Sequence, residues 1–181
     1  MVILIGGCAK EYSNEGGPEQ DSTMPGDIIV RQDSASITLS DCKGCNSTDT
    51  SSGFRWSFKA GITFLCGTVT KAVLSPDSNG MTFFGPSACS LHSGLIITAF
   101  FSNQTLNKDQ SGIAADRASL EYYDNTTNSD VLQSKQPNIF SLTIDSYIRQ
   151  TGISTGTFSG SVLYKNGKII KVDSGRFRIK F

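Results

Sequence analysis

Apolar and polar residues alternate in several short stretches of the chain from Phe54 onward, which is the pattern of β-strands with one buried face. In the first stretch, Phe54, Trp56 and Phe58 alternate with polar residues. Similar patterns predict strands at 62–74, with a bulge at Gly67, and at 81–84, 95–101, 119–123 and 140–144. Residues 76–80 predict a turn and residues 103–117 a loop, and no stretch shows a convincing helical period.

The C-terminus has the clearest pattern. Apolar residues of one parity run from Phe158 to Tyr164, and a second alternating stretch extends to Phe181. Between them, Asn166-Gly167 predicts a two-residue type I′ hairpin turn, because both residues tolerate positive φ angles. We therefore expect an all-β fold, an antiparallel β-sandwich or barrel-like sheet of about eight to ten strands.

The N-terminus carries a different signal. Residues 1–8 form an apolar run that ends in Gly6-Gly7-Cys8, the pattern of a lipobox, where a lipoprotein signal is cut and the new N-terminal cysteine is acylated. Only seven residues precede Cys8 and none is charged, so we expect a truncated signal that starts upstream. The alternative is a buried first strand with a free cysteine. The run is too short for a transmembrane helix.

Composition separates a tether from a folded domain. Residues 9–52 are poor in aromatics and rich in Ser, Asp, Gly and Glu, which predicts a flexible tether, and residues 53–181 then form the β-domain. The whole chain has 41 Ser and Thr residues and 17 aromatic residues, which suits strands joined by short loops. Its formal net charge is zero, so we expect no nucleic-acid partner.

Several short motifs of the chain carry a family resemblance: the start Cys8–Gly17, Trp56-Ser-Phe58, and the closing motifs Gly156-Thr-Phe-Ser-Gly160, Asn166-Gly-Lys168, Val172 and Gly175-Arg-Phe177. In these motifs the chain resembles a family of small β-rich lipoproteins from Bacteroidota. The resemblance implies a lipid-anchored protein of the outer membrane or cell surface, facing the periplasm or the exterior. The resemblance supports this cellular location and the fold, and it identifies no functional residue.

The chain shows no catalytic motif. His92 is the only histidine, so a Ser-His-Asp or Cys-His site is available only through it, and it lies in a turn rich in Ser and Gly. No nucleotide-binding or metalloprotease signature is present, and we expect neither a cofactor nor a bound metal. A hydrolase that uses His92 remains the least favoured alternative.

Four cysteines in the predicted tether and domain offer either disulfides or a zinc site. Cys42 and Cys45 have redox or metal spacing, but the residues after them do not form the helix of a thioredoxin-like site. If 66–74 and 81–89 form a hairpin around 76–79, Cys66 faces Cys89, so we predict a disulfide between them. Pro86 is the weak point, because it disrupts a ladder. Cys42 then pairs with Cys45 or stays free, and a four-cysteine zinc site is the alternative.

Three adjacent aromatic pairs are candidates for binding. Neighbours in a strand point to opposite faces, so one member of each pair faces away from the main core. The candidates are Phe84, Phe101, Tyr122 and Tyr123. Exposed aromatic patches bind partners or sugars, although burial by neighbouring strands is the alternative.

These observations predict a lipid-anchored envelope domain with a binding or structural role. We expect the protein to be attached to the membrane through its N-terminal lipid. We expect its further partner to be a glycan or an envelope protein. A lipocalin-like carrier of a small apolar ligand is the main alternative, and it needs an interior cavity of about 300 Å³ or more.

Overall fold

The computed structural model describes Leu39, Cys42, Gly44, Cys45 and residues 53–102, 106–125, 129–137 and 139–181. These residues belong to one compact unit, Ala35–Phe181. Among them, no helix is long and apolar enough to cross a membrane. The candidate lipidation site Cys8 lies outside the described residues.

The described residues form eleven antiparallel strands, which confirms the all-β prediction. The strands are β1 (Arg55–Ala60), β2 (Thr63–Thr68), β3 (Lys71–Leu74), β4 (Gly80–Pro86), β5 (Ser93–Phe100), β6 (Gln110–Ala114), β7 (Arg117–Asp124), β8 (Ser129–Gln133), β9 (Phe140–Ile148), β10 (Ile153–Tyr164) and β11 (Ile169–Lys180). The sequence pattern missed β6, which lies in the predicted loop 103–117, and β8.

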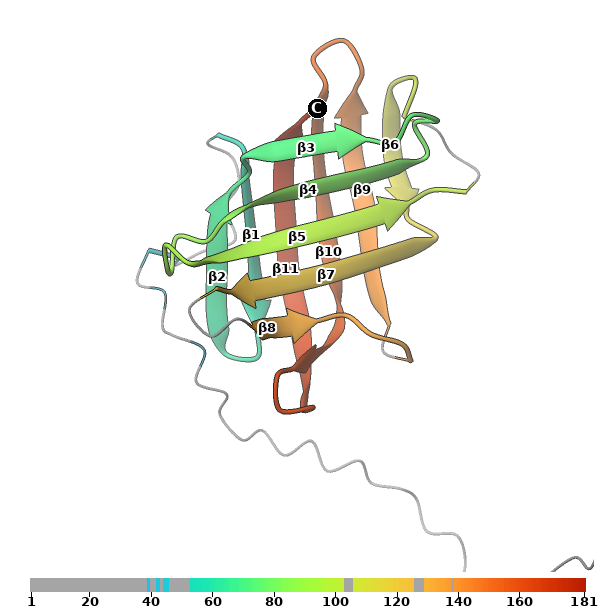
Figure 1. The fold of residues 1–181 in the computed structure, drawn as a ribbon. Coiled ribbons are helices and arrows are strands. Elements are labelled where there is room, and N and C mark those ends of the chain that lie inside the picture. The colour runs from blue at the N-terminus through green and yellow to red at the C-terminus, as the bar shows by residue number, and fades with distance from the viewer. Residues whose placement is uncertain are drawn as a thin grey trace, which may run out of the picture. The chain divides into compact units, whose positions relative to one another are not determined.

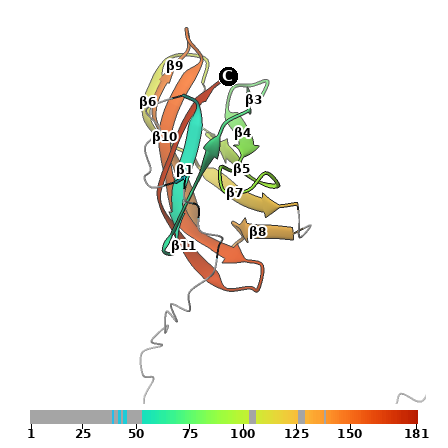
Figure 2. The ribbon, with the colours of Figure 1, turned by 90° about the vertical axis from the view of Figure 1, so that its left-hand side faces the viewer.

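The strands form one sheet that curls into a half-barrel with two facing layers. The order along the sheet is β2-β1-β11-β10-β8-β7-β5-β4-β3, and β9 and β6 extend it from the first part of β10. Figure 1 shows β3, β4, β5, β7 and β8 running across the other strands, and Figure 2 shows the two groups as separate layers. We call the β3-β4-β5-β7-β8 group the front layer and the β2-β1-β11-β10-β9-β6 group the back layer.

Strand β10 joins the two layers. Its residues Ile153 to Gly160 pair with β9 in the back layer, whereas Leu163 and Tyr164 pair with β8 in the front layer. Register shifts at Thr155/Gly156 and at Phe158/Gly160 accompany this change. Bulges increase the local twist and bend a strand, which allows one sheet to turn back over itself.

Aromatic side chains fill the space between the layers. Trp56 and Phe58 of β1 are fully buried, and the ring of Tyr122 from β7 packs edge-on against both, with centroids 6.2 Å away in each case. On the other side, Phe83 of β4 lies 5.1 Å from Phe177 of β11. The core therefore joins β1 and β11 of the back layer to β4 and β7 of the front layer.

The closing hairpin β10–β11 differs from the prediction in its turn. Leu163 pairs with Ile169, and the amide of Tyr164 donates to the carbonyl of Lys168, so the loop has the three residues Lys165 to Gly167. Only Gly167 has a positive φ there, at 81°. A three-residue loop with glycine in the left-handed conformation replaces the predicted two-residue type I′ turn, and the requirement for Gly167 is confirmed.

The boundary between the predicted tether and the domain at residue 53 is wrong. Leu39 belongs to the hydrophobic core, and Cys42 and Cys45 are buried. These three residues fall within the predicted tether 9–52, so the packed domain includes residues well before Gly53. Apart from Gly44, the rest of the predicted tether lies outside the described residues.

Candidate functional site

The cysteines lie where an edge of the back layer meets the front layer. Gly67 of β2 forms an isolated bridge with Ser87, which follows β4. The amide of Ala88 donates to the carbonyl of Cys66 over 2.8 Å. A Cβ on Gly67 would lie 2.1 Å from the Pro86 carbonyl oxygen and 2.4 Å from the Trp56 ring, so this close approach requires glycine.

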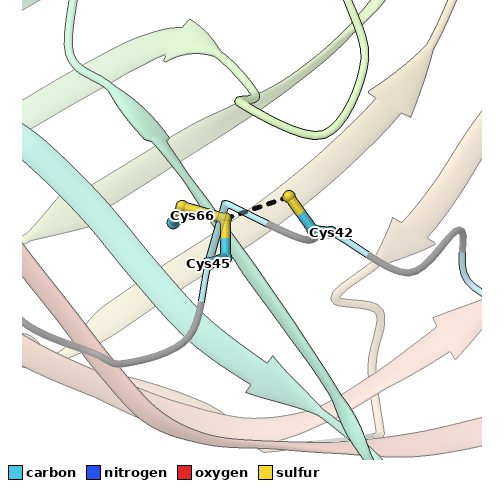
Figure 3. A group of neighbouring side chains, drawn as sticks. All are labelled: Cys42, Cys45 and Cys66. Carbon is cyan, nitrogen blue, oxygen red and sulfur yellow. Dashed lines mark hydrogen bonds between the residues drawn. A yellow bond between two sulfur atoms is a disulfide. The ribbon is translucent and has the colours of Figure 1, made fainter.

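Two disulfides attach the segment before β1 to this seam. Cys42 is bonded to Cys89 in the loop after β4, with Cα atoms 4.8 Å apart. Cys45 is bonded to Cys66 of β2, with Cα atoms 5.5 Å apart. Both separations are within the range that disulfides accept. Figure 3 shows Cys42 and Cys45 beside Cys66. The Sγ atoms of Cys42 and Cys45 are 3.0 Å apart.

The predicted pairs Cys66–Cys89 and Cys42–Cys45 are therefore wrong, and a register shift explains the first error. The hairpin β3–β4 has the predicted pairing, from Leu74 opposite Met81 to Lys71 opposite Phe84. Beyond it, β2 is a separate strand, and Gly67 faces Ser87 where the uninterrupted register would have placed it opposite Ala88. This slip past Pro86 takes Cys89 out of line with Cys66, and both cysteines bond to the earlier segment instead.

A local turn holds the Cys42-x-x-Cys45 segment. The amide of Cys45 donates to the carbonyl of Cys42 over 2.9 Å, and a Cβ on Gly44 would meet nothing within 4 Å. The Sγ atoms of Cys42, Cys45 and Cys66 lie within 4.8 Å of one another, close enough for one metal ion. Zinc requires thiolates, and in this oxidised form each of these sulfurs is bonded to another sulfur.

Tyr122 is buried beside the cysteine loop at this end of the fold. Its side chain is only 5% exposed, and its hydroxyl lies 3.1 Å from the hydroxyls of both Ser87 and Ser93. Ser87 in turn accepts a hydrogen bond from the amide of Cys89. The ring and hydroxyl of Tyr122 thus connect the core to the cysteine loop, and its role as a binding aromatic stays a prediction.

The other aromatic candidates divide between the core and the surface. Phe84 faces away from the core and is 37% exposed, whereas Phe101 is 1% exposed. Phe100, which the sequence analysis did not select, is the exposed member of its pair at 42%. The run Leu95–Phe101 is apolar except at Thr98, so its parity could not be read from the sequence.

Glycines lie beneath the surface aromatics of the front layer. A Cβ on Gly94 would lie 2.3 Å from the hydroxyl oxygen of Tyr123, and one on Gly80 would lie 3.1 Å from the Phe100 ring. The Arg117 guanidinium lies 5.5 Å from the Phe100 ring centroid. These aromatic rings cover sheet positions that have no side chain, which is a structural role in itself.

His92 is exposed in the turn between β4 and β5. Its amide donates to the Ser90 hydroxyl and its carbonyl accepts from Asn125. Within the described residues, the structure records no hydrogen bond to its imidazole. A general base needs a proton donor within about 3 Å, so this arrangement gives no support to the hydrolase alternative.

Comparisons with known proteins identify no relative. No protein-family model, no curated protein and no solved structure matches this chain. The resemblance to Bacteroidota lipoproteins consequently stays a prediction.

Proposed function

We propose that this protein is an exported, lipid-anchored domain of the bacterial cell envelope with a binding or structural role. The observation that carries the proposal is the pair of disulfides, Cys42–Cys89 and Cys45–Cys66. Disulfides persist mainly in exported proteins, because cytosolic thiols are kept reduced. Together with the lipobox pattern at Cys8, they favour attachment to the outer membrane or the cell surface.

The position of the disulfides suits a protein held by its N-terminus. An anchor on Cys8 would connect to the β-domain through the segment that contains Cys42 and Cys45. Both cysteines are bonded to the seam between the layers, one through β2 and the other through the loop after β4. A force applied at the lipid anchor would therefore be transmitted to the seam by the two disulfides and not by noncovalent packing alone.

The exposed aromatic side chains support a binding role for the front layer. Val73, Phe84 and Phe100 are exposed by 41%, 37% and 42% on the outer faces of β3, β4 and β5. Exposed apolar side chains that gather on one face are typical of surfaces that contact another molecule. A glycan or another envelope protein fits this face.

The carrier alternative lacks a supporting observation. Three pockets lined by described residues measure about 100, 260 and 140 Å³, and the largest lies on the outer face of the back layer. A ligand carrier needs an apolar interior of about 300 Å³ or more. In the described part of the chain, packed rings such as Trp56, Phe58 and Tyr122 occupy the space between the layers.

Palmitate labelling tests the anchor. The chain is expressed in a Gram-negative host behind a complete lipoprotein signal, with Cys8 at the cleavage site. The wild type should incorporate labelled palmitate and sediment with membranes, and Cys8→Ser should do neither. Cys45→Ser is the matched control, because it removes another cysteine and should still be labelled. Equal labelling of the wild type and Cys8→Ser would contradict the proposal.

A further inference from the structure

Three arginines lie together on the outer face of the back layer. Arg55 of β1 is directly opposite Arg178 of β11, and Arg176 lies two residues away on the same face. The intervening residues Trp56 and Phe177 point into the core, so the arginine side chains are directed away from it. Lys180 continues the same face of β11. We call Arg55, Arg176, Arg178 and Lys180 the arginine face.

The charges of this face are not neutralised by the described residues around it. The described part of the chain shows one ion pair, Lys171–Asp173 at 3.9 Å, and it does not involve the arginine face. Directly opposed like charges in a sheet are destabilising. The chain as a whole has zero formal net charge, so the arginine face concentrates positive charge on one surface.

A groove lined by hydroxyl groups begins at Arg176. Its volume is about 260 Å³, and its lining is mostly made of short polar side chains from β9 and β10 with the bulge of β11. The polar lining residues are Ser141, Thr143, Thr157, Ser159, Ser174 and Arg176. The Ser141 hydroxyl donates to the Ser159 carbonyl, and the described residues record no hydrogen bond for the hydroxyls of Thr143 and Thr157.

Glycine lets the core ring of Phe158 pack closely against β11 beside this groove. A Cβ on Gly175 would lie 2.3 Å from the Phe158 carbonyl oxygen and 2.4 Å from the Phe158 ring, so no larger residue fits there without movement. Ser174 beside it has a φ of 53°, in the left-handed region that favours glycine. The bulge of β11 thus lines the groove next to Arg176, where the arginine face begins.

We propose that the arginine face and this groove together bind an acidic polysaccharide. Guanidinium groups bind carboxylate and sulfate through paired hydrogen bonds, and serine and threonine hydroxyls match the hydroxyl groups of sugar rings. The proposal goes beyond the binding role proposed above for the front layer, because it names a second surface and its ligand class, and it rests neither on that role nor on the lipid anchor.

An acidic glycan fits this surface better than an anionic membrane does. Proteins that lie on membranes insert large apolar side chains beside their basic residues. None of the residues of the arginine face or of the groove is an exposed large apolar side chain. A membrane surface would also leave the hydroxyl groups of the groove without a specific partner.

Binding of two defined polysaccharides tests the proposal. The full 181-residue chain, with its disulfides formed, is titrated with heparin and with polygalacturonate, and dextran serves as the neutral glycan. The triple variant R55Q/R176Q/R178Q is compared with K71Q/K108Q/K135Q, which loses the same charge elsewhere. The arginine triple should bind both acidic glycans at least about tenfold more weakly, since each charged contact contributes up to about 1 kcal/mol, while the lysine triple should bind within about twofold of the wild type.

A hydroxyl-removing variant and a comparison with anionic lipid vesicles make the result specific. Thr157→Val keeps the shape of the side chain and removes its hydroxyl, so it should weaken polygalacturonate binding about two- to fivefold without changing the thermal midpoint. Equal weakening by both triple variants, absence of glycan binding by the wild type, or preferential binding to anionic lipid vesicles would overturn the proposal. None of these outcomes depends on palmitate labelling, so failure here is distinguishable from failure of the anchor.

Discussion

The front and back layers share one core but present different outer faces. On the front layer, Phe84 and Phe100 are exposed among threonines and apolar neighbours. On the back layer, arginines occupy the corresponding outward positions of β1 and β11, next to a groove of hydroxyl groups. The inward positions of both layers are mostly apolar, with the buried Ser93 and Ser154 as exceptions, so the main difference between the layers lies in their outward residues.

The two outer faces also differ in what their side chains do for the sheet. Phe100 and Tyr123 lie over Gly80 and Gly94, so these aromatic rings fill positions without side chains. Arg55 and Arg178 gain no such contact and repel each other across the register. An exposed aromatic residue can therefore be explained by the fold alone, whereas the arginine face is the stronger indication of a ligand.

The largest effect should come from the two neighbouring phenylalanines at the end of β5. Phe101→Ala removes a fully buried ring and should lower the free energy of unfolding by about 3–5 kcal/mol. Phe100→Ala removes a ring that is 42% exposed and should cost less than about 1 kcal/mol. Urea denaturation measures both variants. Similar losses would mean that the inner and outer faces of the front layer are wrongly assigned.

The disulfides join the two layers at their seam, and their removal should be almost as costly. In the chain-entropy model, losing Cys42–Cys89 by a double serine substitution should cost about 4 kcal/mol, and losing Cys45–Cys66 about 3 kcal/mol. The larger cost follows from the larger sequence separation, 47 residues against 21. Guanidinium denaturation without reductant gives the two values. A greater loss for the Cys45–Cys66 variant would contradict this ordering.

Substitutions in one turn of each layer should differ in their effect on stability. Gly167 in the back-layer hairpin has a φ of 81°, so Gly167→Val should cost at least about 1 kcal/mol, because a β-branched residue resists positive φ. Ser78 in the front-layer turn already has a φ of 57°, so Ser78→Gly should not lower the thermal midpoint. If Gly167→Val leaves the stability unchanged, the turn does not require a positive φ at residue 167.

The smallest effect concerns the repulsion on the back layer. Arg55→Glu replaces a like-charge pair with an opposite-charge pair and should raise stability by roughly 0.2–1 kcal/mol at low salt. High salt should shrink the gain, because it screens exposed charges. Lys71→Glu on the front layer is the control and should show no such gain. If Arg55→Glu is destabilising at low salt, Arg55 already has a favourable partner.

Strands with one exposed face could be predicted from the sequence, and strands without alternation could not. The stretches around Trp56 and in the closing hairpin alternate, and the structure confirms them as β1, β10 and β11. The run Leu95–Phe101 has no polar residue except Thr98, so its parity, and with it the burial of Phe101, was ambiguous. Strand β6 contains two small residues and one glycine, which gave no apolar pattern.

The candidate site was harder to predict because it depends on distant segments. The four cysteines meet only because β2 leaves the hairpin register beside Pro86 and the segment at Cys42 crosses to it. The arginines of β11 alternate with its apolar residues in the sequence, but their neighbour Arg55 is brought opposite Arg178 by strand pairing. Local patterns contain no information on such pairings.

Peptide mapping without reduction is the most direct test of the central claim. This claim is that the protein is an exported domain whose segment before β1 is attached to the seam by two disulfides. Trypsin cuts after Lys43, Lys59, Lys71 and Arg117, so each of the four cysteines falls in its own peptide. For protein recovered from the cell envelope, we expect two linked pairs, Cys42 with Cys89 and Cys45 with Cys66. A Cys66–Cys89 or Cys42–Cys45 link, or four free thiols, would contradict it.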